Sequence, residues 1–329
     1  MEISLFMILF IVVALAFDFL NGFHDSANTV ATLISSRAME PQKALVLNAV
    51  ANFVGPFLFG VAVATTIGHE VIIESAATLS VVLSALLGAI VWNVLTWLLG
   101  IPSSSSHALI GGLLGAAITG HGFDAILLPG LTKVLLTLLI SPIVGMLAGY
   151  FLMKLVLFLA RGASPRINVF FKRAQIVTAT ALALSHGTND AQKTMGIITM
   201  GLLAGGVLPG FAVPTWVIIA CAAAMALGSV MGGWRIIHTM GGKFYRIRPV
   251  HSFTSQIASA AMILGAALIG GPVSTTHVVS TTILGVGSAE RVNKVRWGVV
   301  GQIMVAWLLT IPISALVAMI CYWIIERII

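Results

Sequence analysis

The sequence has very few charged residues. Asp, Glu, Lys and Arg make up 8% of its 329 residues, whereas hydrophobic residues make up 59%. A soluble globular domain carries about 25% charged residues, so this class is excluded. Apolar runs near or beyond the roughly 20 residues that span a bilayer lie at 5–20, 79–99, 134–159 and 299–323. Because lipid satisfies no backbone polar groups, we predict an all-α polytopic integral membrane protein, multi-pass in the cell membrane.

Cysteine is also scarce. Cys221 and Cys321 lie inside apolar segments without metal-ligand spacing, which excludes a disulfide framework or a zinc site and favours a packing role. No basic residue precedes the first apolar run, so a cleaved signal peptide is not expected. The net charge of +7 comes from Lys and Arg in short connections. This pattern is typical of cytoplasmic loops rather than of nucleic-acid binding.

Two polar motifs occur twice. The stretch at 21–29, NGFHDSANT, returns 165 residues later at 186–194 as HGTNDAQKT. A Pro and hydroxyl cluster, GIPSSSSH at 100–107, returns as GPVSTTH at 271–277. The chain is therefore interpreted as a duplication. We predict a first repeat at 1–160, a basic cytoplasmic linker at 161–173 and a second repeat at 174–329.

Each repeat is expected to contain a helix with the acidic motif, a second helix, an apolar pair folded about the Pro and hydroxyl cluster, and a last long helix. If the pair is a re-entrant helical hairpin, each repeat crosses three times, and the second repeat is inverted relative to the first. Gly and Pro at the turns fit broken helices that line a site. Loop charges agree: Arg37 and Lys43 follow the first helix, whereas the equivalent stretch 201–214 is uncharged.

Asp25 and Asp190 occupy matched positions in the two acidic motifs. An ionisable residue at membrane depth indicates an ion or substrate pathway. Carboxylates are ligands for hard cations such as sodium and can also carry protons. Asn21 and Asn189 add amide oxygens beside them. These four residues are the candidate sodium ligands.

The hydroxyl clusters are candidates for anion binding. Ser and Thr after a Pro commonly cap a helix, but such a half-helix start also presents free NH groups, hydroxyl donors and a positive dipole end. Two tips arriving from opposite sides would enclose a small tetrahedral oxyanion. The candidate anion-binding residues are Ser104, Ser105, Ser106, Ser274, Thr275, Thr276, Asn28 and Lys193.

Lys193 breaks the symmetry of the repeat because it replaces Asn28. Because Lys193 lies within an apolar stretch, we expect its amine to bind a partner acid or the anion itself rather than to extend to the lipid headgroups. The histidines that flank the motifs are expected to be hydrogen-bonded structural residues, with a proton-relay role open; they are His24, His107, His186 and His277.

Two carboxylates repel an anion strongly in a cavity of low dielectric constant. Cations therefore have to accompany the anion, and the pattern favours cation-coupled anion symport.

The paired motifs resemble those of the inorganic phosphate transporter (PiT) family in its prokaryotic form, in the stretches FLNGFHDSANTVAT at 19–32 and SHGTNDAQKTMG at 185–196. The resemblance covers essentially the full length. It implies an inverted-repeat transporter, a homodimer, that carries inorganic phosphate with sodium or protons. We favour sodium over protons and expect the site near the membrane midplane between the two repeats. In family terms Asp25 and Asp190 would coordinate the coupling ion, and the hydroxyl tips would hold phosphate.

One departure from the family concerns the number of coupled cations. Animal members carry an acid in the second helix of each half and an Asn where Lys193 stands. Here Asn52 and the Ala and Met residues around Ala224 occupy the second helices. No cofactor other than sodium ions is expected.

Alternatives remain open at this point. A sulfate permease of the same fold, transport of phosphate complexed with a divalent metal, and an anion channel are the rival interpretations. A membrane-embedded hydrolase could use Ser106 with His107, but the repeat offers Thr276 and His277 without a third group, so enzyme activity is not expected.

Overall fold

The computed structural model describes residues 5–328 and is helical throughout, joined by turns and loops. The α-helices are α1 (Leu5–Ser35), α2 (Pro41–Val54), α3 (Ala62–His69), α4 (Leu79–Leu99), α5 (Ser105–His121), α6 (Leu128–Leu159), α7 (Ile167–Ala204), α8 (Thr215–Met231), α9 (Trp234–His238), α10 (Pro249–Leu268), α11 (Thr275–Glu290) and α12 (Trp297–Ile328). Short helical turns are η1 (Gly55–Phe57), η2 (Glu74–Ala76), η3 (Phe123–Ala125), η4 (Thr239–Lys243) and η5 (Val292–Lys294). Within these residues the only β-structure is an isolated bridge between Ile72 and Ile126. The all-α prediction is confirmed.

Four helices, α1, α4, α6 and α12, are long and apolar enough to cross a membrane. The number rises to six if each of two bent helix pairs is one span. The segment α2–η1 meets α3 at a bend of 76°, and α8 meets α9–η4 at 61°. A glycine with a positive φ lies in each break, Gly60 at 78° in the first and Gly232 at 68° in the second. This backbone conformation ends a regular helix. The molecule is a multi-pass helical membrane protein.

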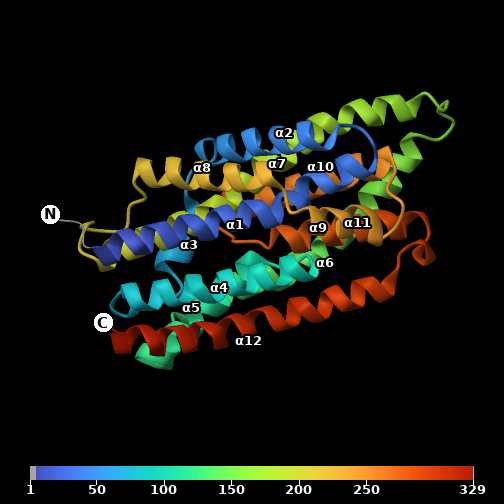
Figure 1. The fold of residues 1–329 in the computed structure, drawn as a ribbon. Coiled ribbons are helices and arrows are strands. Elements are labelled where there is room, and N and C mark those ends of the chain that lie inside the picture. The colour runs from blue at the N-terminus through green and yellow to red at the C-terminus, as the bar shows by residue number, and fades with distance from the viewer. Residues whose placement is uncertain (1–4, 329) are drawn as a thin grey trace.

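The two halves of the chain pack in a pattern that repeats. Helix α1 packs on α8, as its counterpart α7 packs on α2, and α5 packs on α12, as α11 packs on α6. Counterparts run in opposite directions: α1 and α6 run from the end of the bundle where the termini lie, whereas α7 and α12 run back to it (Figure 1). The predicted inversion of the second repeat requires this arrangement.

The connection between α6 and α7 lies at the other end of the bundle (Figure 1). It spans residues 160–166, because α7 already begins at Ile167. The second part of the predicted linker 161–173 is therefore helical. The outer limits of the predicted repeats, residues 1 and 329, lie outside the described residues.

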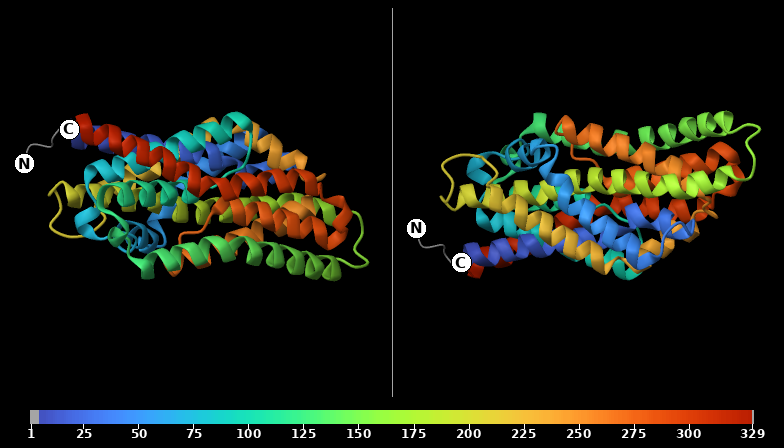
Figure 2. Two further views of the ribbon diagram at one scale, coloured as in Figure 1. Left: turned by 90° about the horizontal axis from the view of Figure 1, so that it is seen from below. Right: turned by 90° about the horizontal axis from the view of Figure 1, so that it is seen from above.

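The two apolar hairpins meet inside the bundle. Helices α4 and α5 enter from one end and α10 and α11 from the other, so that both turns lie in the middle (Figure 2). The first turn begins at Gly100 in the left-handed conformation, φ 65°, and continues through buried Pro102 and Ser103. These buried turns are those of the predicted re-entrant hairpins. If both helices of a pair crossed the whole membrane, the turn between them would lie in water.

Glycines in the acidic motifs allow the closest helix contacts. A Cβ atom at Gly22 of α1 would lie 2.1 Å from the carbonyl oxygen of Met225 in α8. At the matched Gly187 of α7, it would lie 2.5 Å from the carbonyl oxygen of Asn52 in α2. Each motif glycine therefore brings its acidic helix against the second helix of the other half.

Candidate functional site

Asp25 and Asp190 meet at the centre of the molecule. Helices α1 and α7 run unbroken through their motifs and carry these acids to one point, where single ligand atoms of Asp25, Asp190 and His186 all lie within 4.8 Å of one another. Both carboxylates are fully buried, with 1% and 0% of their surface exposed. A buried pair of acids at this separation is a candidate cation site.

The hydroxyl tips of both hairpins contact these acids. Thr276 at the start of α11 donates a hydrogen bond of 3.0 Å to Asp25, and Ser105 at the start of α5 lies 3.3 Å from the same carboxylate. Thr275 donates a bond of 2.8 Å to Asp190. Each half of the chain thus supplies a donor to Asp25, and the site is built jointly.

Lys193 is bound inside this cluster. Its Nζ donates to a carboxylate oxygen of Asp190, to the hydroxyl of Ser106 at 2.5 Å and to the carbonyl oxygen of Val273 at 2.9 Å. Its side chain is 2% exposed. The expected partner acid is therefore Asp190, and the amine also reaches the α5 tip, where an anion would lie.

Two of the predicted anion ligands cap helices. Ser104 accepts a bond from the backbone NH of His107, and Ser274 does the same from His277, at 3.1 and 3.2 Å. Each bond satisfies one free NH of the first turn. These serines fix where the two half-helices begin, and Ser105, Ser106, Thr275 and Thr276 follow as the first helical residues.

The amides of the motifs have unpaired oxygens. Asn28 donates to Thr276 at 3.1 Å and Asn189 donates to the carbonyl oxygen of Gly271 at 3.3 Å. The side-chain oxygens of Asn21, Asn28 and Asn189 are buried and have no hydrogen-bond partner within the described residues. A buried acceptor without a donor is costly, and a cation or a protonated ligand would satisfy it.

Asp18 is a third buried acid that sequence reasoning missed. It lies seven residues before Asp25 on α1, two turns away on the same face. Thr194 of α7 donates to its Oδ1 at 2.9 Å, whereas Oδ2 has no partner within the described residues. Its counterpart in the second half is Ala183. The duplication therefore gave no signal for it, but its position inside an apolar run did.

The histidines split into two pairs. His24 contacts Asp25 at 2.9 Å, and His186 bonds Asn52 at 3.1 Å through Nδ1 while its Nε2 lies 3.0 Å from Asp190. The last contact has no hydrogen-bond geometry. His107 and His277, one residue beyond the tips, lie side by side with ring centroids 4.5 Å apart.

The cluster is closed and negatively charged. The site residues on α1, α5, α7 and α11 are all buried, so substrate cannot enter without movement. Two acids, Asp25 and Asp190, face one Lys193. An anion placed here would be repelled by several kcal/mol per charge pair even at an effective dielectric constant near 20. An anion could therefore be held here only if the charge of the acids were neutralised.

Known proteins are similar to this chain in both sequence and fold. The phosphate transporter family matches residues 21–165 and again 159–318. A Bacillus subtilis protein named a probable low-affinity inorganic phosphate transporter is 47% identical over 327 residues, 98% of this chain and 97% of that protein. A Rhizobium meliloti protein of the same name is 45% identical over 315 residues, 95% of this chain and 94% of that protein.

A solved structure described as the sodium-dependent phosphate transporter has the same fold. Its TM-score is 0.91, it covers 99% of this chain and 100% of its own, and 23% of the aligned residues are identical. The family match covers both halves of the chain and the curated relatives align over nearly its whole length. The chain belongs to the phosphate transporter family, whose members are transporters and not enzymes.

Proposed function

We propose that this chain is a secondary active symporter of the cell membrane that imports inorganic phosphate together with cations, sodium rather than protons. The observation that carries the proposal is the meeting of Asp25 and Asp190, from opposite halves, with the hydroxyl tips of both hairpins. The names of the relatives support phosphate as substrate. The description of the structural neighbour supports sodium.

Each group has a distinct role in this proposal. Asp25 and Asp190, with the unpaired oxygens of Asn21 and Asn189, hold the cations. The tip hydroxyls and the first-turn NH groups of α5 and α11 hold the phosphate oxygens, joined by Asn28 and Lys193. The hydroxyls that now donate to the two acids would turn to the substrate when cations take their place.

Alternating access follows from the arrangement of the halves. The site lies where two hairpins enter from opposite ends (Figure 2). In inverted-repeat transporters, movement of one repeat against the other exposes such a central site to each face in turn. The predicted repeats at 1–160 and 174–329 are the bodies that we propose to move.

Phosphate is favoured over sulfate by the unpaired acceptors. Hydrogen phosphate carries an OH that can donate to the unpaired oxygen of Asn28, whereas sulfate at neutral pH has no donor. A site with buried acceptors discriminates strongly against a ligand that leaves them unpaired.

Uptake into liposomes tests the proposal. The purified protein should accumulate labelled phosphate when an inward sodium gradient is imposed, and excess sulfate should compete weakly. Asp25→Asn and Asp190→Asn should each abolish this accumulation. Asp124→Asn, at an exposed acid of η3, is the matched control and should retain it. Equal uptake driven by a proton gradient without sodium would refute sodium coupling, and uptake that needs no ion gradient would refute symport.

A further inference from the structure

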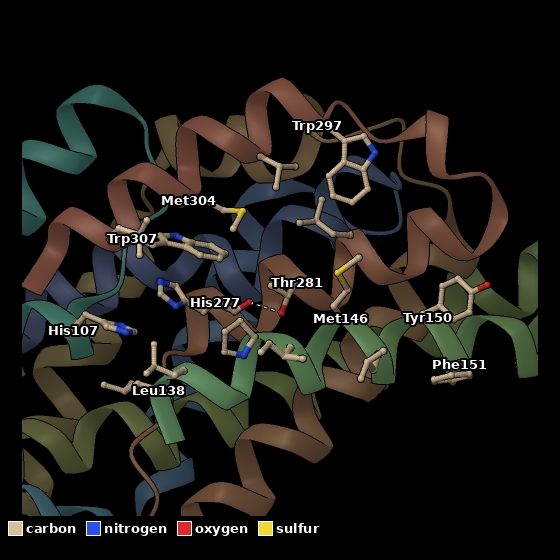
Figure 3. Close-up of a pocket in the computed structure, with 17 residues that line it drawn as sticks. His107, Leu138, Met146, Tyr150, Phe151, His277, Thr281, Trp297, Met304 and Trp307 are labelled. Atoms are coloured by element: carbon tan, nitrogen blue, oxygen red, sulfur yellow. Dashed lines mark hydrogen bonds between the residues drawn. The ribbon is translucent and has the colours of Figure 1, made fainter. Parts of the chain in front are cut away.

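A deep apolar groove lies on the outside of the bundle between α6 and α12. Its volume is about 600 Å³, and α11 forms its floor. The side chains that line it run from His107, Leu138 and Trp307 at one end to Tyr150, Phe151 and Trp297 at the other (Figure 3). The proposed transport function uses none of its apolar residues.

The edges of this groove face lipid. Ile143 of α6 is 64% exposed and Leu308 of α12 is 75% exposed, and both line it. From Trp307 to Trp297 the helix rises by about 15 Å, at 1.5 Å per residue. This is half of the roughly 30 Å hydrocarbon core. The groove is therefore about as long as the hydrocarbon region of one leaflet is thick, and an acyl chain could lie along it.

One end of the groove carries the residues typical of a membrane interface. Tyr150 and Trp297 flank it, as aromatic residues do at the headgroup level. Lys154 extends over the Tyr150 ring, with its Nζ 5.6 Å from the ring centroid. Arg296 directly precedes Trp297 and is exposed, as is Arg291. Within residues 5–328 no ion pair engages Arg291 or Arg296.

The nearby acid is already neutralised. Glu290, at the end of α11, binds both Arg248 and Lys294 and lies 3.1 Å from His251. Partial burial and the positive charges of Arg248 and Arg291 lower the pKa of Lys294 below its usual value. The field at this end of the groove is therefore positive. It is also the end of the α6–α7 connection (Figure 1), which the positive-inside rule assigns to the cytoplasm.

We propose that this groove binds one anionic phospholipid of the cytoplasmic leaflet, with an acyl chain between α6 and α12 and the headgroup phosphate at Arg291 and Arg296. Basic pockets between membrane helices on the cytoplasmic side bind anionic headgroups in this way, and that leaflet is rich in such lipids. The methyl end of the acyl chain would contact the stacked rings of His277 and Trp307, whose centroids are 3.8 Å apart. His277 directly follows Thr276, so the lipid would lie behind the α11 tip.

Native mass spectrometry of the delipidated full chain tests this site. Phosphatidylglycerol should bind about tenfold more tightly than phosphatidylcholine with the same chains. The double variant Arg291→Gln, Arg296→Gln should lose this preference, whereas Lys172→Gln, at an exposed basic residue of α7 near the same end, should keep it. Equal affinity for both lipids in the wild type, or a preference that survives the double variant, would overturn the proposal.

A groove-filling variant tests the acyl chain. Ile143→Trp should weaken the binding of both lipids, and Leu155→Trp, on the same helix but outside the groove, should not. If Ile143→Trp leaves lipid binding intact but converts a dimer to a monomer, the occupant is a second copy of the chain and the lipid proposal fails. These readouts need no phosphate transport, so they are independent of the proposed function.

Discussion

Lys193 is the residue that distinguishes the two halves of the site. Its amine bonds Asp190 and Ser106 in the closed structure, and it is the one cation in a cluster of two acids within the described residues. In the proposed mechanism, sodium bound at Asp190 would release the amine, which could then bind the phosphate held at the α5 tip. A hydrogen bond to a charged group contributes about 1.5–3 kcal/mol.

We therefore expect Lys193→Met to raise the KM for phosphate by about tenfold or more at saturating sodium. Initial rates of labelled phosphate uptake in liposomes measure this. Lys133→Met is the matched control, because Lys133 also binds an acid, Glu70 at 3.0 Å, but at the rim of the molecule. An unchanged KM, with only the amount of folded protein reduced, would mean that Lys193 has a structural role alone.

Asp18 tests whether the third acid belongs to the cation site. Asp18→Asn keeps an oxygen for the bond from Thr194 and places an NH2 group where the unpaired Oδ2 acceptor lies. If a cation uses that oxygen, the sodium concentration for half-maximal uptake should rise several-fold while the melting temperature stays close to the wild type. A lower melting temperature with an unchanged sodium dependence would assign Asp18 to packing between α1 and α7.

The sequence predicted some of these residues better than others. Asp25 and Asp190 were predictable because duplication marked them twice, and their meeting follows from antiparallel counterparts. Asp18 has no acidic counterpart in the second half, so the duplication did not mark it. The capping bonds of Ser104 and Ser274 could be expected from residue type, but which hydroxyl faces which acid depends on helix rotation, which a sequence does not specify.

At the level of the helices, the packing of α11 against α6 positions the second hydroxyl tip. A Cβ at Gly285 would lie 2.0 Å from the carbonyl oxygen of Met146, so Gly285→Ala must push the two helices apart. Overpacking of this kind costs about 1–3 kcal/mol. We expect a lower melting temperature in detergent and slower phosphate uptake.

Gly265→Ala is the control for this variant. Nothing lies within 4 Å of a Cβ at Gly265 in α10, and Ala stabilises a helix relative to Gly by roughly 0.5–1 kcal/mol. Its melting temperature should be unchanged or slightly higher. Equal melting temperatures for both variants would contradict the close approach of α6 and α11.

The extents of the helices were only partly predictable. Helix α4 has the same limits as the apolar run at 79–99. Thr78 caps the start of this helix, and Gly100 in the left-handed conformation ends it. By contrast, the first apolar run at 5–20 continues to Ser35 in α1. The acidic motif, which we expected on a helix, lies within this one continuous helix and does not break it.

For the whole molecule, orientation in the bilayer is the main prediction. The α6–α7 connection should face the cytoplasm and the α3–α4 connection the outside. In a background with Cys221 and Cys321 replaced by alanine, a membrane-impermeant maleimide should label Ser75→Cys in intact cells. It should label Ser164→Cys only after lysis. Both serines are exposed; the reverse labelling would invert the topology.

The homodimer stays a prediction from family resemblance. Light scattering of the detergent-solubilised protein would measure the mass of the protein component. A mass of one chain, in detergents that preserve phosphate binding, would refute it.

Sodium-dependent phosphate binding at equilibrium tests the joint site most directly. Labelled phosphate should bind the purified wild type only in the presence of sodium. Asp25→Asn and Asp190→Asn should each remove this binding, and the double variant should lose nothing further, because residues that act as a unit are not additive. If each single variant keeps part of the binding and the two losses add in the double variant, the two acids belong to separate sites and the shared cation site is wrong.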